Sequence, residues 1–313
     1  MENVSEREEG RNTLKKLYGM YPLIVIVGPT ASGKSSLAVR LARESNGEII
    51  SADSRQVYQG MDVGSGKIPK QQRMGIPHHL LDVASPKRRF TVAQYQKLAL
   101  QIIRQVHKRG KLPLLVGGSP FYVYSVVDGI QIPEVKPNLK LRARLERLRS
   151  DELYRKLQQL DPQRAKTIEQ KNPRRLIRAL EIVLGTKKPV PSLRKNPLPY
   201  PALLLGIYKS NEELKKLIAK RLELRLHKGM IAEVKKLKES GLSWKRLEEF
   251  GLEYRFVAQY LQRKISRQEM LNSIQRETEH FARRQMAWFK KDQRICWIKN
   301  DDEARILVKK FLK

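Results

Sequence analysis

The chain has 313 residues, 40% of them hydrophobic, which is enough for one large domain or two domains with cores of their own. It is strongly basic, because 64 Lys and Arg stand against 32 Asp and Glu, a formal net charge of +32. Such an excess repels itself in a folded protein and indicates a polyanionic partner, nucleic acid first and an anionic membrane surface second. The single cysteine, Cys296, excludes an internal disulfide and a multi-cysteine zinc site.

The sequence also argues against membrane insertion. No apolar stretch approaches the length of a membrane span. The first twenty residues are charged and lack the apolar core of a signal peptide. We therefore expect a monomer in the cytoplasm with no membrane partner.

In chain order, short apolar runs that end at turn signals alternate with helical patterns over the first 130 residues. Ser35–Glu44 and Val92–Arg109 have the periodicity of helices. The apolar runs predict buried strands at Leu23–Val27, Glu48–Ala52, His79–Val83 and Leu112–Val116. This alternation predicts an α/β fold of the P-loop NTPase type, with a parallel sheet and helices on both faces.

The pattern changes after Ile132. Leu139–Leu184 has helical periodicity and no strand candidate, and a proline-rich stretch follows that suits neither a helix nor an inner strand. Directly after it, Ala202–Tyr208 again has the pattern of a buried strand. This order predicts a discontinuous α/β core, residues 1–132 and 198–313, with an all-helical insertion at 133–197.

The C-terminal part is predicted to be mostly helical. Ser266-Arg-Gln-Glu269 has the form of a capping box at the start of a long helix that ends near Lys290. Ile295–Asn300 is a candidate for a last strand.

The most specific local motif is G-x-x-x-x-G-K-S, the phosphate-binding loop (P-loop), which lies between a predicted strand and a predicted helix. Backbone N–H groups and the helix N-terminus enclose a phosphate, Lys34 reaches the terminal phosphate, and the Ser35 hydroxyl can hold Mg²⁺. The motif alone does not say which diphosphate is bound. Its residues are Gly28, Pro29, Thr30, Ala31, Ser32, Gly33, Lys34 and Ser35.

Polar residues follow the other predicted strands. Asp53 lies at the carboxyl end of the second strand, where α/β sheets bind ligands, although an Asp there is also a common turn former. Asp82, near the third strand, is a weaker candidate for a metal ligand. Ser119 closes the fourth strand, so its hydroxyl is expected to face the same crevice as Asp53.

Several segments together resemble the bacterial tRNA dimethylallyltransferase (tRNA isopentenyltransferase) family. The likeness extends from about Leu23 to Ile298 through "GPTASGKS", "ISADSRQVYQGMDVGSGK", "PHHLLDV", "PLLVGGS", "NPRRLIRALEI", "RLELRLHKGMIAEV" and "FARRQMAWFKKDQRICWI". The resemblance implies that a dimethylallyl group moves from dimethylallyl diphosphate to N6 of the adenosine 3′-adjacent to the anticodon. It also implies that the P-loop holds the diphosphate of the prenyl donor, with Mg²⁺ as cofactor.

The resemblance further implies roles for single residues. Asp53 accepts the proton or a hydrogen bond of the attacking amine, Ser119 shares that network, and Arg221 binds the diphosphate leaving group. On the pattern alone, Arg221 falls on the apolar stripe of its helix, which fits a snorkelling side chain equally well. The implied tRNA contacts are Asp53, Ser54, Arg55, Gln56, Ser119, Arg142, Arg174, Arg175, Leu176, Ile177 and Arg178.

Three segments depart from the family pattern and concern the donor pocket. They are Gly64-Ser-Gly-Lys67-Ile, the turn that contains Pro120, and Gly251-Leu-Glu-Tyr-Arg255. Pro120 removes a backbone N–H and stiffens its turn.

The predicted insertion carries 18 Lys and Arg against six Asp and Glu between Lys136 and Lys195, a net charge of +12. Such a run is usually a solvated face, but an implied RNA substrate favours contact with the phosphates of the anticodon stem-loop. The alternatives are a P-loop kinase, an enzyme that prenylates free adenine nucleotides, and a non-catalytic RNA-binding protein.

Overall fold

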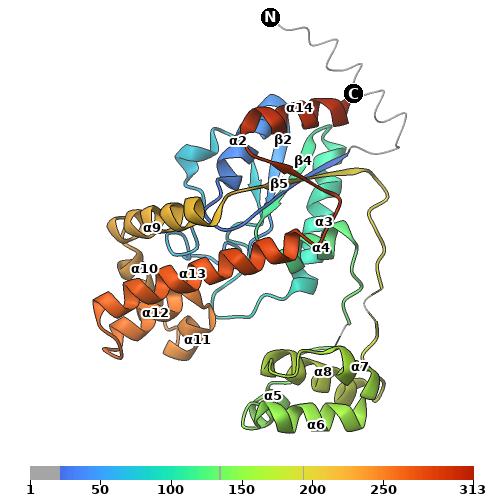
Figure 1. Cartoon of the computed structure of the whole chain (residues 1–313), viewed down its shortest axis with the longest axis vertical. Coiled ribbons are helices and arrows are strands. Elements are labelled where there is room, and N and C mark those ends of the chain that lie inside the picture. Colours follow the sequence, from blue (N-terminus) through green and yellow to red (C-terminus); the bar gives the residue numbers. More distant parts are fainter. Residues whose placement is uncertain (1–21, 134, 193) are drawn as a thin grey trace, which may run out of the picture. The chain divides into compact units, whose positions relative to one another are not determined.

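The computed structural model describes residues 22–133, 135–192 and 194–313. The chain forms two compact units (Figure 1). One takes in the described residues up to Gly129 and those from Pro197 onward, and the other is Ile130–Asn196. In the part of the chain that the structure covers, no helix is both long and apolar enough to cross a membrane.

The first unit is built on a six-stranded sheet with the spatial order β3-β2-β4-β1-β5-β6. All neighbouring strands pair in parallel, β1 is an unbroken aliphatic run, and every residue of β1 and β4 is buried. The predicted α/β class is confirmed. The strands are β1 (Leu23–Val27), β2 (Gly47–Ser51), β3 (His78–His79), β4 (Leu112–Gly117), β5 (Ala202–Ile207) and β6 (Ile295–Ile298).

Helices cover both faces of this sheet, as predicted. Ile24 and Ile26 of β1 point to the face that α2 and α14 cover, and α3 packs against β2 and β4 on the other face. The helices around the sheet are α2 (Lys34–Glu44), α3 (Val92–Lys108), α4 (Pro120–Val127) and α14 (Asp301–Leu312), with a short 3-10 helix at Lys70–Arg73.

The third strand is much shorter than the predicted His79–Val83. It contains only His78–His79, and the chain then turns through Leu80 and Asp82, whose φ angles are +62° and +60°. Left-handed backbone cannot continue a strand, so this run is a turn, in which Leu80 is buried and Val83 is exposed. The five other predicted strands agree with the structure to within two residues at each end.

The helices after β5 include the two that approach the P-loop. Leu214 and Ile218 of α9 and Ala282 of α13 pack with Ala31 of that loop. The predicted capping box is present, with Ser266 and Glu269 each bonded to the other's backbone N–H. The helices are α9 (Asn211–His227), α10 (Met230–Glu239), α11 (Trp244–Glu249), α12 (Leu252–Leu261) and α13 (Arg267–Phe289).

The described residues of the second unit form four helices around a leucine-rich core. This unit is yellow-green in Figure 1. One of its buried carboxylates, Glu181, is 1% exposed and accepts hydrogen bonds from Arg142 (2.9 and 2.7 Å), Arg178 (2.6 Å) and the backbone N–H of Asn138 (2.7 Å). Burial alone raises the pKa of Glu181, but these bonds hold it below its usual value. The helices are α5 (Leu139–Leu145), α6 (Ser150–Leu160), α7 (Pro162–Thr167) and α8 (Pro173–Thr186).

We predict that Glu181→Ala lowers the free energy of unfolding by roughly 2–4 kcal/mol, because Arg142 and Arg178 lose a buried partner. Urea unfolding followed by circular dichroism measures the change. The wild-type contribution of Glu181 is present at neutral pH and is lost as the pH falls through its depressed folded-state pKa. The matched control is Glu169→Ala, whose side chain is 57% exposed, with an expected loss below about 1 kcal/mol. Equal losses in the two variants would contradict the assignment.

Candidate active site

The P-loop connects β1 to α2, and its backbone is shaped for an anion. Gly28, Ala31 and Gly33 have φ angles of +148°, +66° and +90°, a run of left-handed backbone that brings successive N–H groups together. Gly33 is the N-cap of α2, so the first N–H groups of that helix lie at the same place. The loop and the helix end therefore form one electropositive site.

Lys34 lies against this loop. Its Nζ donates to the carbonyl oxygen of Pro29 and lies 3.5 Å from Ser32 Oγ. The pKa of Lys34 is lowered to about 7, mainly by burial and also by repulsion from Arg221, while the charge of Asp53 opposes both effects. Lys34, Arg221 and Asp53 are thus close enough to interact electrostatically.

Asp53 stands two residues beyond β2 and forms a turn. Its Oδ1 accepts the backbone N–H groups of Arg55 (2.8 Å) and Gln56 (3.4 Å). The turn-forming role considered for this residue is therefore real. It occupies one carboxylate oxygen only, and no described residue bonds to Oδ2. A fixed carboxylate with one open oxygen suits a proton acceptor.

The two residues after Ser54 hold this turn in place. Arg55 Nε donates to Phe250 O at 2.6 Å. Gln56 Oε1 accepts from Ser51 Oγ at 3.1 Å, and its Nε2 donates to Gly66 O at 3.3 Å. The sequence predicts tRNA contacts for Arg55 and Gln56, whereas these side chains are engaged with protein atoms in the structure.

Ser119 lies directly beside the Asp53 turn, because its Oγ accepts the backbone N–H of Ser54 at 3.1 Å. Gly117 makes this approach possible, since a Cβ there would stand 2.1 Å from Ala52 O. Pro120 is the first residue of α4, where a backbone N–H has no partner within the helix. The departure at Pro120 therefore removes no helical hydrogen bond.

Arg221 enters the site from α9. Burial and the charge of Arg225 lower its pKa, while the charges of Glu253 and Asp53 raise it. Arg225, one turn further on, is buried in an ion pair with Glu253 of α12. Across the described residues, neither Lys34 nor Arg221 makes an ion pair. Because partly buried cations need compensation, the site is complementary to an anion.

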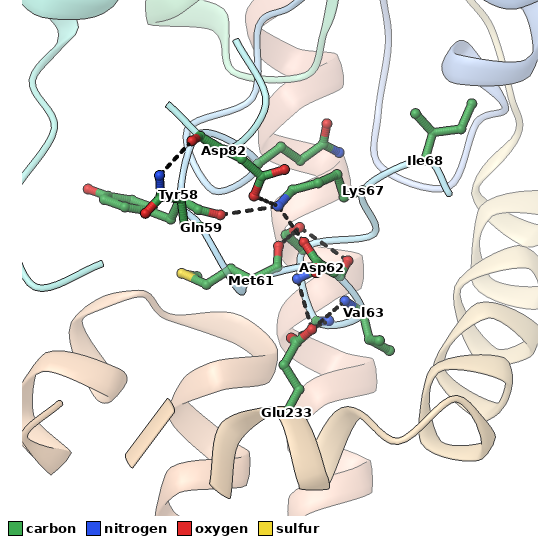
Figure 2. A network of polar contacts seen from close by, with 12 residues as sticks. Tyr58, Gln59, Met61, Asp62, Val63, Lys67, Ile68, Asp82 and Glu233 are labelled. Carbon is green, nitrogen blue, oxygen red and sulfur yellow. Dashed lines mark hydrogen bonds and ion pairs between the residues drawn. The ribbon is translucent and has the colours of Figure 1, made fainter. Parts of the chain in front are cut away.

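The loop around Gly64, one of the departures from the family pattern, is held by hydrogen bonds to a carboxylate (Figure 2). Glu233 of α10 accepts the backbone N–H groups of Asp62 (2.8 Å), Val63 (2.6 Å) and Gly64 (3.0 Å). The hydroxyl of Tyr254 also donates to Glu233, at 2.9 Å. A Cβ at Gly64 would stand 2.7 Å from the Tyr254 ring, so glycine lets the loop lie on it.

Lys67, in the same loop, forms an ion pair with Asp82. Its Nζ, almost fully buried, donates to Asp62, to Asp82 Oδ1 at 2.6 Å and to Tyr58 O at 3.1 Å (Figure 2). Asp82 is thus an ion-pair partner of Lys67, and its role as a metal ligand stays a prediction. No cluster of three or more His, Cys, Asp or Glu that could hold a metal occurs in the described ranges.

The predicted tRNA contacts of the helical unit differ in accessibility. Arg174 and Arg175 are exposed at the start of α8. Leu176 and Ile177 are 0% and 8% exposed and belong to the core of the unit, so their side chains are not available to RNA. The remaining two bind Glu181, namely Arg142 and Arg178.

Comparison with known proteins identifies the family of this chain. The model of the IPP transferase family matches residues 56–292. The chain belongs to the IPP transferase family. Among related IPP transferases, the tRNA dimethylallyltransferase of Roseiflexus sp. is 42% identical over 303 residues, 94% of this chain and 99% of the relative. That of Syntrophomonas wolfei is 40% identical over 299 residues, 93% and 96% of the two chains.

Solved structures of IPP transferases agree in fold. The tRNA isopentenylpyrophosphate transferase of Bacillus halodurans is 33% identical, with a TM-score of 0.70 over 93% of this chain and 95% of that one. A eukaryotic dimethylallyltransferase acting on tRNA is 26% identical, with a TM-score of 0.72 over 90% of this chain and 74% of that one.

The sequence reasoning missed several residues that line or support this candidate site. Gln285 of α13 contacts both the P-loop and Gly118. The sequence feature that could have revealed it is a polar residue on the same buried face of the helix as Ala282 and Phe289. Glu233 and Glu253 had no comparable local signal, because their partners come from distant loops and helices.

We predict that inorganic diphosphate binds with uptake of a proton by Lys34 at pH 7.5. Much of this lysine is neutral there, because its pKa is about 7, and a bound anion stabilises the charged form. The contribution of Lys34 to the affinity is greatest below pH 7 and declines as the pH rises through its pKa. Calorimetry in two buffers of different ionisation enthalpy measures the number of protons taken up on binding. The same measurement on Lys34→Met gives the protons taken up by the diphosphate itself, which are subtracted from the wild-type value. Equal uptake by both proteins would exclude Lys34 as the proton acceptor.

Proposed function

We propose that this chain transfers a dimethylallyl group from dimethylallyl diphosphate to N6 of the adenosine 3′-adjacent to the anticodon in tRNA. The observation that carries the proposal is a pair of cations without carboxylate partners among the described residues, Lys34 and Arg221, which lie beside a P-loop and both feel the charge of Asp53. An anionic leaving group and a proton acceptor are the two requirements of this transfer. The tRNA dimethylallyltransferases among its relatives support the same reaction.

The cationic side of the site serves the leaving group. When the allylic C–O bond breaks, its electron pair stays on the diphosphate, and fixed positive groups lower the barrier by stabilising that charge. The loop N–H groups, Lys34 and Arg221 are suited to this task. The Ser35 hydroxyl, on the exposed first turn of α2, would hold Mg²⁺ together with phosphate oxygens. The ion would neutralise part of the diphosphate charge.

The carboxylate side serves the acceptor. The N6 amine forms the new N–C bond and gives up one proton, which Asp53 accepts. Oδ1 is held in the turn, so Oδ2 is the oxygen available to the amine. The Ser119 Oγ accepts a hydrogen bond from the backbone N–H of Ser54, which leaves the hydroxyl of Ser119 free to donate one to the adenine. An adenosine in a loop reaches such a site once it is unstacked.

The helical unit is proposed to hold the anticodon stem-loop. Its net charge of +12 between Lys136 and Lys195 suits a phosphate backbone, and Arg174 and Arg175 are its predicted contacts with exposed side chains. We further propose that the protein is a cytoplasmic monomer.

One experiment separates this function from its rivals. Labelled dimethylallyl diphosphate is incubated with the protein and with bulk tRNA, AMP or no acceptor, and parallel incubations measure ATP hydrolysis and tRNA binding. Label in tRNA is the expected result. Label in AMP indicates a prenyltransferase of free nucleotides, ATP hydrolysis without tRNA indicates a kinase-type enzyme, and tRNA binding without transfer indicates an RNA-binding protein.

We predict that Asp53→Asn binds donor and tRNA normally but loses about 10²–10⁴-fold in transfer rate, the usual contribution of a general base. An amide oxygen retains the Asx turn and removes the charge. Single-turnover kinetics with saturating substrates measure the loss. Asp302→Asn, 83% exposed on α14, is the control and is expected to match the wild type. Turnover of Asp53→Asn within a few-fold of wild type would reject the assignment.

We also predict that Arg174→Glu weakens tRNA binding and flattens its salt dependence by up to about one unit of log–log slope. Donor binding stays unchanged. Lys309→Glu, an equal charge reversal on α14, is the control. Arg142→Glu and Arg178→Glu are unsuitable here, because they break the Glu181 network and so damage the fold. An unchanged affinity and slope for Arg174→Glu would place the RNA elsewhere.

A further inference from the structure

A single buried amide joins the P-loop to the turn that carries Ser119. Gln285 of α13 is 4% exposed. Its Oε1 accepts the backbone N–H of Thr30 at 2.8 Å, and its Nε2 donates to the carbonyl oxygen of Gly118. The first contact is with the loop proposed to hold the prenyl diphosphate. The second is with the residue directly before Ser119, on the side proposed to hold the adenosine.

The chemistry of these two contacts requires a primary amide of this length. One end must accept a hydrogen bond and the other must donate one, which neither a carboxylate nor a thioether does. The backbone is shaped for the same group, since a Cβ at Gly118 would stand 2.4 Å from Gln285 Nε2. Because both contacts are buried, loss of either leaves a polar group unsatisfied.

The contacts continue to the proposed proton acceptor. Gly118 precedes Ser119, whose Oγ accepts from Ser54, the neighbour of Asp53. We propose that Gln285 is a positioning residue that sets the spacing between the phosphate cradle and the Ser119–Asp53 turn. The proposal rests on the function proposed above, in which these two parts hold the two reacting molecules.

Such a spacing matters because the transfer joins two separately bound substrates. A displacement of about 1 Å between reacting groups costs on the order of 10²-fold in rate, even when the substituted residue touches neither substrate. Gln285 is well placed to prevent it, since the packing of Ala282 against the P-loop also anchors α13.

The test compares Gln285→Met with Gln268→Met, the same substitution at an exposed site on the same helix. We expect Gln285→Met to lower kcat for prenyl transfer about 10–100-fold with KM for tRNA unchanged, and Gln268→Met to match the wild type. Gln285→Glu keeps the acceptor oxygen and loses the donor to Gly118, so it is expected to lower kcat as well. Thermal unfolding of each variant accompanies the kinetics.

A double variant with Ser119→Ala distinguishes positioning from a general loss of stability. If Gln285 acts through the Ser119 turn, Gln285→Met with Ser119→Ala loses no more than about threefold beyond the larger single loss. Multiplied losses, or a wild-type kcat for Gln285→Met, would overturn the proposal. Should Gln285→Met not fold, a wild-type kcat for Gln285→Glu overturns it instead. A wild-type protein without prenyl transfer refutes the proposed function itself, which is a separate outcome.

Discussion

Parallel pairing throughout the sheet is the constraint on which the site depends. Because parallel strands all end at the same edge, the P-loop after β1, Asp53 after β2 and Ser119 after β4 meet although they are far apart in the sequence. Their approach is close enough to need glycine at position 117. The helices that follow β5 then add Arg221 and Gln285 to a place that the sheet has already prepared.

Charge is treated in opposite ways at two places in the chain. In the helical unit, Glu181 accepts hydrogen bonds from two arginines and a backbone N–H, so the charge of this carboxylate is compensated within the fold. At the P-loop, Lys34 and Arg221 keep a positive excess that Asp53 only partly offsets, and burial lowers the pKa of both. An uncompensated buried cation destabilises a protein unless a ligand supplies the anion. This contrast separates basic residues that maintain the fold from those that are suited to a diphosphate.

Local patterns predicted much of the fold. Five of the six strands, the capping box at Ser266 and the P-loop between strand and helix depend on residues a few positions apart, and all are present as predicted. The prediction for His79–Val83 was wrong because hydrophobicity does not report that Leu80 adopts a left-handed backbone. The resemblance grouped Arg174, Leu176 and Arg178 together as RNA contacts. In the structure, however, Arg174 is exposed, Leu176 lies in the core, and Arg178 forms an ion pair with Glu181.

The sequence by itself determined the α/β class, the phosphate-binding motif, the positions of Asp53 and Ser119 at strand ends, and the basic character of the helical unit. Only the tertiary structure decided which polar side chains are already occupied. Asp82 forms an ion pair with Lys67, which is 15 residues away in the sequence. Arg142 is bonded to Glu181, 39 residues away, and Gln285 is bonded to Thr30, 255 residues away. Burial makes such pairing obligatory, but spacing along the chain does not encode the choice of partner, because partners meet only when separate strands and helices pack together.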